Sequence, residues 1–175
     1  MAKRKEAPAE NTDRQAAKGG EGQAGVSRKE LVALLNEDLS REYQAIIAYV
    51  IYSQAIKGAQ YMAIAQQLEE HAGEELAHAL ILSRQIDYLG GYPNNVAKPV
   101  KTSEKPEDML QFDLDNENET IRNYRLRVRQ CEALGEFGMA ELIRKILVDE
   151  QDHQIDLATA LNKEIPDVTQ ADERA

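Results

Sequence analysis

Two glutamate and histidine pairs in this chain have the side chains and the spacing of metal ligands. They follow the pattern E-x-x-H and are Glu75 with His78 and Glu150 with His153. Residues three apart on an α-helix point the same way, so each pair can hold one metal ion. Both pairs interrupt apolar stripes that have the spacing of a helix with one buried face. Because a buried charge without a partner is costly, the pattern predicts that both pairs bind something in the interior.

A further glutamate precedes each pair at the same separation along the chain. Glu42 precedes Glu75 exactly as Glu117 precedes Glu150, so one constant difference in residue number, here called the repeat offset, carries Glu42, Glu75 and His78 to Glu117, Glu150 and His153. Four converging carboxylates repel one another unless cations lie between them. Carboxylate and imidazole without thiolate suit iron or manganese. The sequence therefore predicts a di-metal site with these six residues as ligands, and two such metals about 3.5 to 4 Å apart can activate oxygen or peroxide.

Four long helices are predicted to position these residues. The prolines leave two long proline-free blocks, one on each side of the segment GGYPNNVAKPVKTSEKP, and breaks near Gly58 and Gly135 divide each block. Ser27 followed by Glu30 forms a capping box at the first helix start. The predicted helices are 27–56, 60–89, 105–133 and 136–163, each roughly 45 Å long.

The links between the helices decide the topology. Short turns make the first and second helices antiparallel, and likewise the third and fourth. Residues 90–104 could span up to about 50 Å, enough to run the length of the bundle. We predict an all-α four-helix bundle with one long crossover over residues 27–163. Residues 1–26 are predicted to be a disordered tail and residues 164–175 a short polar tail.

Composition narrows the possible functions. The chain has 175 residues, with 21 Lys and Arg against 31 Asp and Glu, a formal charge of −10 that favours cations over nucleic acid as partners. Cys131 is the only cysteine, which excludes a disulfide framework and a cysteine-based metal site and suits a small buried side chain. No stretch resembles a signal peptide or a membrane span, so we expect a cytoplasmic protein.

Four stretches of this sequence resemble the helices of a known superfamily. They are LLNEDLSREYQAIIAY, EEHAGEELAHALIL, MLQFDLDNENE and ILVDEQDHQIDL. They resemble the ferritin-like di-iron carboxylate proteins, and among these bacterioferritin, over about residues 27–163. The resemblance implies a ferroxidase that binds two ferrous ions per subunit at the six residues above. It also implies oxidation by oxygen or hydrogen peroxide and storage of ferric mineral in a hollow cage.

The resemblance extends to residues around the ligands. Tyr49 matches a tyrosine next to the bacterioferritin centre, and either Tyr49 or Tyr124 could hydrogen-bond a ligand carboxylate; the alternative is an ordinary core aromatic. His71 could join an iron path or be a merely packed or solvated histidine. Glu70 and Glu74 could face the cage interior and help nucleate mineral, or belong to a solvated acidic face.

Two departures from bacterioferritin affect cofactor and assembly. Bacterioferritin binds haem through a methionine directly after the Glu of its first E-x-x-H, where this chain has Leu76, so haem is not expected. The sequence after the fourth helix, IPDVTQADERA, is polar and lacks a fifth helix. We therefore expect a cage of 12 subunits, as in mini-ferritins, with 24 as the alternative.

Other functions remain open on the same pattern. A manganese catalase or a substrate oxygenase could use such a site, although both normally need additional segments, and rubrerythrin needs paired cysteines. A DNA-protecting mini-ferritin is a further alternative. Its DNA contact would be the tail of residues 1–26, whose net charge is +1.

Overall fold

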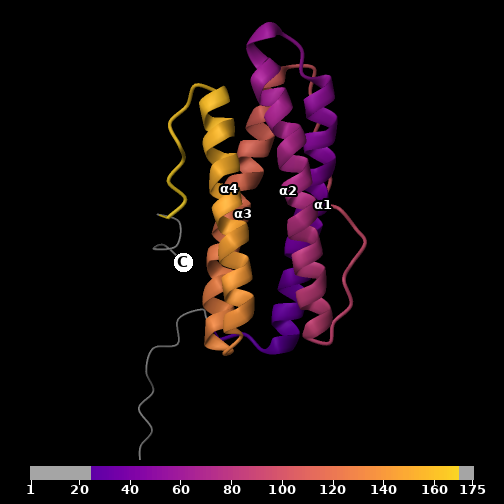
Figure 1. Ribbon diagram of the computed structural model, residues 1–175, viewed down its shortest axis with the longest axis vertical. Coiled ribbons are helices and arrows are strands. Elements are labelled where there is room, and N and C mark those ends of the chain that lie inside the picture. The colour runs from indigo at the N-terminus through magenta and orange to yellow at the C-terminus, as the bar shows by residue number, and fades with distance from the viewer. Residues whose placement is uncertain (1–24, 170–175) are drawn as a thin grey trace, which may run out of the picture.

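The computed structural model describes residues 25–169, in which four long helices form a bundle (Figure 1). The elements are α1 (Arg28–Ala55), the short 3-10 helix η1 (Ala59–Tyr61), α2 (Met62–Tyr88), α3 (Pro106–Ala133) and α4 (Phe137–Ala160). The predicted all-α bundle with one long crossover is confirmed. Within residues 25–169, no helix has the length and apolarity that crossing a bilayer requires. The predicted disordered tail falls almost entirely on residues outside the described range.

Local sequence signals set the helix boundaries. The capping box at the start of α1 is formed, since the Ser27 amide donates to Glu30 Oε2 at 2.8 Å and the Glu30 amide donates to Ser27 Oγ at 3.2 Å. The turns after α1 and α3 contain Gly58 and Gly135, with φ of 128° and 76°. Residues with a side chain rarely adopt such positive φ values, so glycine is the residue best suited to these two turns.

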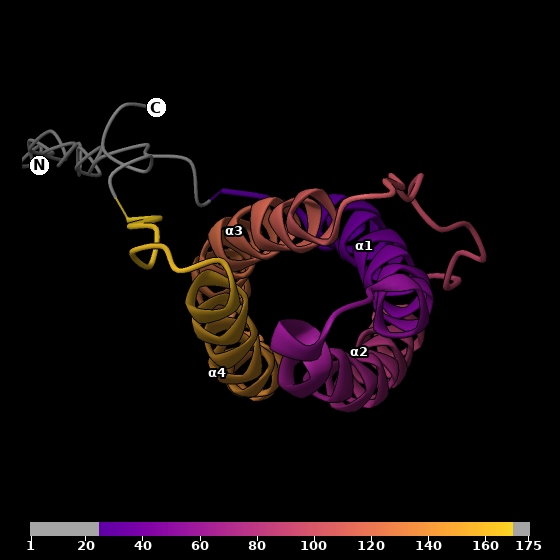
Figure 2. The ribbon, with the colours of Figure 1, turned by 90° about the horizontal axis from the view of Figure 1, so that it is seen from above.

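The helices surround a common axis in the order α1, α2, α4, α3 (Figure 2). Contacts are most extensive within the hairpins α1–α2 and α3–α4, and smaller contacts join α1 to α3 and α2 to α4. The crossover of residues 89–105 runs the length of the bundle outside α1, so α3 starts at the end where α2 starts (Figure 1). Both hairpins therefore present their middle turns to one central region.

Polar side chains of α1 attach the crossover. Asn36, Ser40 and Gln44 are spaced by four residues and so lie on one face of the helix. Hydrogen bonds join this face to the crossover, among them Asn94 N to Asn36 Oδ1 at 2.8 Å, Asn94 Nδ2 to Ser40 Oγ at 2.9 Å, and Gln44 Nε2 to the Pro99 carbonyl at 2.8 Å. The long link is thereby held against the α1 side of the bundle.

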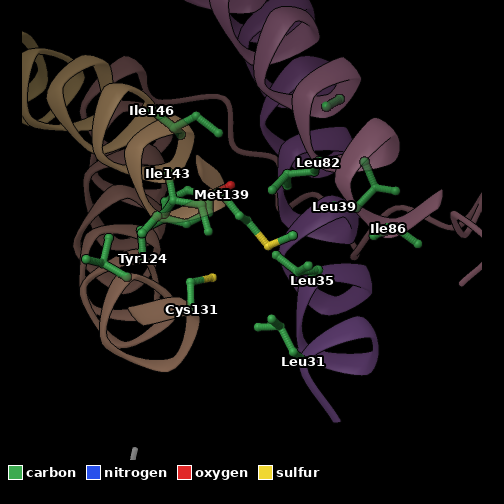
Figure 3. Packing of buried hydrophobic residues seen from close by; sticks show 13 residues of the cluster. Leu31, Leu35, Leu39, Leu82, Ile86, Tyr124, Cys131, Met139, Ile143 and Ile146 are labelled. Carbon is green, nitrogen blue, oxygen red and sulfur yellow. The ribbon is translucent and has the colours of Figure 1, made fainter. Parts of the chain in front are cut away.

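The apolar core is divided into two clusters. One lies toward the α1 start and contains Leu35, Ile86, Ile143 and the fully buried Cys131 (Figure 3). The other lies toward the α1 end and includes Tyr52, Leu68, Leu110 and Leu157. Between the two clusters, each helix turns polar residues inward. The apolar ends stabilise the bundle and leave its middle free for a polar site.

The chain turns back after α4. Asn162 has a positive φ of 53°, and residues 163–169 descend beside α4 (Figure 1). Gln154 Nε2 donates to the Pro166 carbonyl at 3.2 Å, and Val168 is buried. The part of the predicted polar tail that is described, residues 164–169, therefore packs against the bundle, and no helix follows α4 within it.

Candidate metal centre

Six carboxylate and imidazole side chains meet in the middle of the bundle, and each is at most 2% exposed. One comes from α1, two from α2, one from α3 and two from α4. They are the six residues predicted from the repeated spacing: Glu42, Glu75, His78, Glu117, Glu150 and His153. The structure thus brings together every ligand candidate named in the sequence.

The ligand atoms form two overlapping groups. Within each group, one atom per residue lies within 4.8 Å of the others, and the groups are Glu42, Glu75, His78 and Glu150, and Glu75, Glu117, Glu150 and His153. Glu75 and Glu150 belong to both groups, which places their carboxylates where each could bind two ions. Glu42 and Glu117 each belong to one group, so each would hold one ion at an end of the site, and they are called the end carboxylates below.

The buried polar atoms of the cluster have fewer hydrogen bonds than they can make. Five atoms of the cluster make no hydrogen bond: Glu42 Oε2, Glu75 Oε1, Glu150 Oε1 and Oε2, and His153 Nδ1. The four carboxylate oxygens lie 3.2 to 3.7 Å from the Nδ1 atoms of His78 and His153, so each histidine nitrogen is shared among several carboxylates. Leaving such atoms unpaired in the interior costs free energy, and here they face one another. Oxygen and imidazole donors suit iron or manganese. The residues present therefore fit a pair of divalent ions.

Electrostatics within the cluster favour protons where cations are absent. Burial, together with repulsion from Glu75, raises the pKa of Glu42 well above its usual range. Burial and repulsion from Glu150 do the same to the pKa of Glu117. Burial alone would lower the pKa of both central histidines, but contacts with the carboxylates outweigh it, so the pKa of His78 is strongly raised and that of His153 is raised to about 12.

Two outer carboxylates orient the histidines. His78 Nε2 lies 3.0 Å from Asp149 Oδ2, and His153 Nε2 lies 2.8 Å from Glu74 Oε2. Each contact leaves Nδ1 facing the cluster and fixes the ring, as outer partners of metal-bound histidines do. This role was not predicted from the sequence, where Glu74 was expected either to face the cage interior and help nucleate mineral or to belong to a solvated acidic face. The repeat offset carries Glu74 to Asp149 and was the signal that could have revealed the pair.

The two tyrosines hold the end carboxylates. Tyr49 on α1 donates its hydroxyl hydrogen to Glu117 Oε1 on α3, and Tyr124 on α3 donates to Glu42 Oε1 on α1. Both rings are fully buried. These crossed hydrogen bonds each fix one oxygen of an end carboxylate and leave the other oxygen for a metal ion.

His71 lies beside the six-residue cluster. It is buried, its ring centroid is 4.0 Å from that of His153, and its Nε2 lies 3.2 Å from Asp156 Oδ2. Burial and the neighbouring His153 lower its pKa. Glu70, in contrast, is exposed. His71 is therefore an internal residue and not part of the solvated face.

Cavities reach the cluster from two opposite sides. One, of about 330 Å³, lies between α1 and α3; the four central glutamates line its floor, and Arg41, Lys98 and Lys101 lie near its mouth. The other, of about 290 Å³, lies between α2 and α4 and is lined by His71, His153 and several carboxylates. Small ions or molecules can thus approach the centre from either side.

Comparison with known proteins gives concordant matches. The ferritin-like domain family matches residues 32–165. A bacterioferritin of Brucella melitensis is 26% identical over 141 residues, 77% of this chain and 88% of the relative. A bacterial ferritin of Synechocystis is 30% identical over 125 residues, 70% and 80% of the two chains. A crystal structure of ferritin-like, diiron-carboxylate proteins from Bacillus anthracis has 33% identity and a TM-score of 0.74, covering 77% of this chain and 97% of that one.

Removing a tyrosine hydroxyl should weaken metal binding. In Tyr49→Phe or Tyr124→Phe one end carboxylate loses its orienting donor, and we expect roughly 10- to 100-fold lower affinity for Co²⁺. Equilibrium dialysis measures this. Tyr52→Phe is the matched control, because its hydroxyl bonds the Lys101 carbonyl and not a central carboxylate. Equal affinities in all three variants would contradict the role assigned to the tyrosines.

Metal loading should release protons. The pKa values of Glu42, Glu117, His78 and His153 are all raised, so without metal these groups keep their protons to higher pH than usual. Binding requires the unprotonated ligands, so affinity should rise with pH and each bound ion should displace protons. Titration of metal-free protein with Co²⁺ in dilute indicator buffer measures the release. Affinity independent of pH between about 5.5 and 7.5, within roughly 1 unit of the usual histidine pKa, would be the contrary result.

Proposed function

The chain belongs to the ferritin-like domain family, and from this premise we propose that it stores iron and oxidises Fe(II) at the centre described above. The observation that carries the proposal is the pair of ligand groups that share Glu75 and Glu150. Shared carboxylates hold two ions close together, as two-metal chemistry requires. The family match and the bacterioferritin relatives support iron as the metal.

We propose Fe(II) as substrate and oxygen or hydrogen peroxide as oxidant. Two iron ions supply one electron each, which together reduce oxygen to peroxide or peroxide to water. The protein's part is to hold both ions in one geometry before and after electron transfer. Glu42 and Glu117 bind the ends, while Glu74 and Asp149 keep both imidazoles in place. This preorganisation lowers the cost of reaching the reactive arrangement.

The α2–α4 side is proposed to face the cavity of a cage. Four carboxylates lie around its opening: Glu74, Asp149, Asp152 and Asp156. Such a surface attracts ferrous and ferric ions and could help mineral to form. Glu70 is exposed one position before His71, so it remains a candidate for the same surface. Leu76, 53% exposed on α2, has no sulfur to offer a haem iron, so haem is not part of the proposal.

No described residue favours the alternatives. The DNA-binding alternative depends on the tail of residues 1–26, of which the structure describes only the last two. A catalase or an oxygenase would use the same ligands. Neither would store iron as mineral, so the mineral content of the assembled protein distinguishes them from a storage protein. A cytoplasmic location stays a prediction from the sequence.

Loss of a shared carboxylate should abolish rapid iron oxidation. Wild-type protein is expected to bind two Fe(II) per subunit in the six-residue centre and to oxidise them in a fast phase when air is admitted. Glu75→Ala or Glu150→Ala removes a ligand of both ions, so the fast phase should disappear while circular dichroism stays helical. Stopped-flow absorbance measures the phase. Glu70→Ala, which removes an exposed acid of α2, is the control and should retain it; normal kinetics in all three variants would sink the assignment.

Assembly should give a hollow shell, and we propose twelve subunits. The described residues after α4 support this size, because they fold back along the bundle and do not form another helix. Light scattering on the native protein is expected to return about twelve chain masses, and iron loading should give a mineral core per shell. A mass of 24 chains would refute the proposed size, and a stable dimer without mineral would refute storage.

A further inference from the structure

A buried aspartate lies one helical turn before each end carboxylate. Asp38 precedes Glu42 on α1 and Asp113 precedes Glu117 on α3, each by four residues, and the repeat offset carries one pair to the other. Residues four apart share a face of an α-helix. Both aspartates are at most 2% exposed, so water screens their charge only weakly. Each aspartate therefore acts on the metal position of its own end carboxylate, here called the Glu42 end and the Glu117 end.

The charge of Asp38 is neutralised by arginine. Arg127 on α3 places Nε 2.6 Å from Asp38 Oδ2, and Arg41 on α1 places Nη1 3.1 Å from Asp38 Oδ1. Arg127 is 4% exposed, and its Nη1 also donates to Gln130 Oε1 at 2.7 Å, so this guanidinium is fixed in the interior. Arginine stays protonated in proteins. A cation at the Glu42 end therefore has guanidinium groups nearby and gains little attraction from Asp38.

Asp113 lacks this neutralisation. At the places that match Arg127 and Arg41 the chain has Tyr52 and Asn116, and neither side chain carries a positive charge. The Tyr52 hydroxyl donates to a main-chain carbonyl of the crossover instead. Asp113 Oδ2 is buried and makes no hydrogen bond. Because burying a carboxyl group without a partner costs free energy, packing alone does not explain this residue.

A cation at the Glu117 end supplies the partner that Asp113 lacks. Without metal, burial and repulsion from Glu75 raise the pKa of Asp113, which favours its neutral form. A divalent ion one turn away acts in the opposite direction, because a nearby positive charge favours the carboxylate, and the two then attract each other at low dielectric. Asp113 also acts on the tyrosine that holds Glu117, since burial, Glu117 and Asp113 together raise the pKa of Tyr49.

We propose that Asp113 makes the Glu117 end of the centre the first to bind a divalent ion. At the Glu42 end, Arg127 and Arg41 weaken binding, so that end fills second. This order rests on the proposed two-ion centre and adds a sequence of events to it. Asp113 is a positioning residue, because it acts on the ion through space and is not one of the six ligands. The first Fe(II) is then held by Glu117 and the shared carboxylates until the second ion completes the pair.

Variants that disable one end measure the two affinities separately, without any redox reaction. In Glu42→Gln the Glu117 end keeps all its ligands, and in Glu117→Gln the Glu42 end keeps all of its own. Equilibrium dialysis of the full chain with Co²⁺ should show an ion in Glu42→Gln that is bound roughly tenfold more tightly than the ion in Glu117→Gln. Adding Asp113→Asn should remove most of this advantage in Glu42→Gln and leave the ion in Glu117→Gln unchanged.

Two further variants control for charge and for folding. Asp115→Asn removes an exposed acid of the same helix and should change neither affinity. Arg41→Gln removes a positive charge near the mouth of the α1–α3 cavity and leaves the core of α3 intact, so it tests the order even where Asp113→Asn lowers stability. It should strengthen the ion in Glu117→Gln severalfold. Circular dichroism verifies that each variant stays helical.

The outcomes separate the order of binding from the centre itself. Equal Co²⁺ affinities in Glu42→Gln and Glu117→Gln would overturn the order, and so would an equal loss in both when Asp113→Asn is added. If the wild-type protein still bound two ions per subunit, the proposed function would remain standing in either case. Fewer than two Co²⁺ per subunit at saturation of the wild-type protein would refute the two-ion centre and the order with it.

Discussion

The mutual repulsion of four buried glutamates is the constraint on which the rest of this structure depends. Their carboxylates converge between two apolar clusters and are at most 2% exposed, so water screens their repulsion only weakly. The raised pKa values of both histidines and of Glu42 and Glu117 favour protons that offset this charge, and two bound cations would offset it in the same way. The apolar ends of the bundle hold the helices together against this repulsion. Protons or cations therefore stabilise the arrangement.

One hairpin design, used twice, supplies all parts of the site in pairs: lone glutamates, E-x-x-H pairs, tyrosine donors and outer acids. The two hairpins differ around one buried aspartate. Asp38 is buried and paired with Arg127, whose Nε lies 2.6 Å from Asp38 Oδ2. The symmetry-related places hold Asp113 on α3 and Tyr52 on α1, so Asp113 has a tyrosine where Asp38 has an arginine, and its Oδ2 has no hydrogen-bond partner. Burial, with repulsion from Glu75, raises the pKa of Asp113 well above its usual range, which keeps it neutral.

Much of this could be predicted from the sequence, because prolines and glycines mark the helix ends and the repeated separations mark the ligands. The fold, the family resemblance and the convergence of six residues are found as predicted. The sharing of Glu75 and Glu150 could not be predicted, since it depends on how carboxylates from different helices turn toward one another. The contact of His71 with Asp156 could not be predicted either, because Asp156 lies on another helix, far along the chain. Residues 163–169 pack against α4 because the backbone turns at Asn162, and no sequence pattern predicted this turn.

The two cavities that reach the centre differ in the charges around their openings. Near the α1–α3 mouth, Arg41 contacts Asp38 and Glu119, and Lys98 contacts Glu37, so opposite charges largely cancel there. The α2–α4 mouth has four acids around it and no lysine or arginine among its described lining residues. A divalent cation is attracted more strongly to the second side, because its field is not cancelled. A neutral oxidant is not attracted by either field and can enter through the α1–α3 opening.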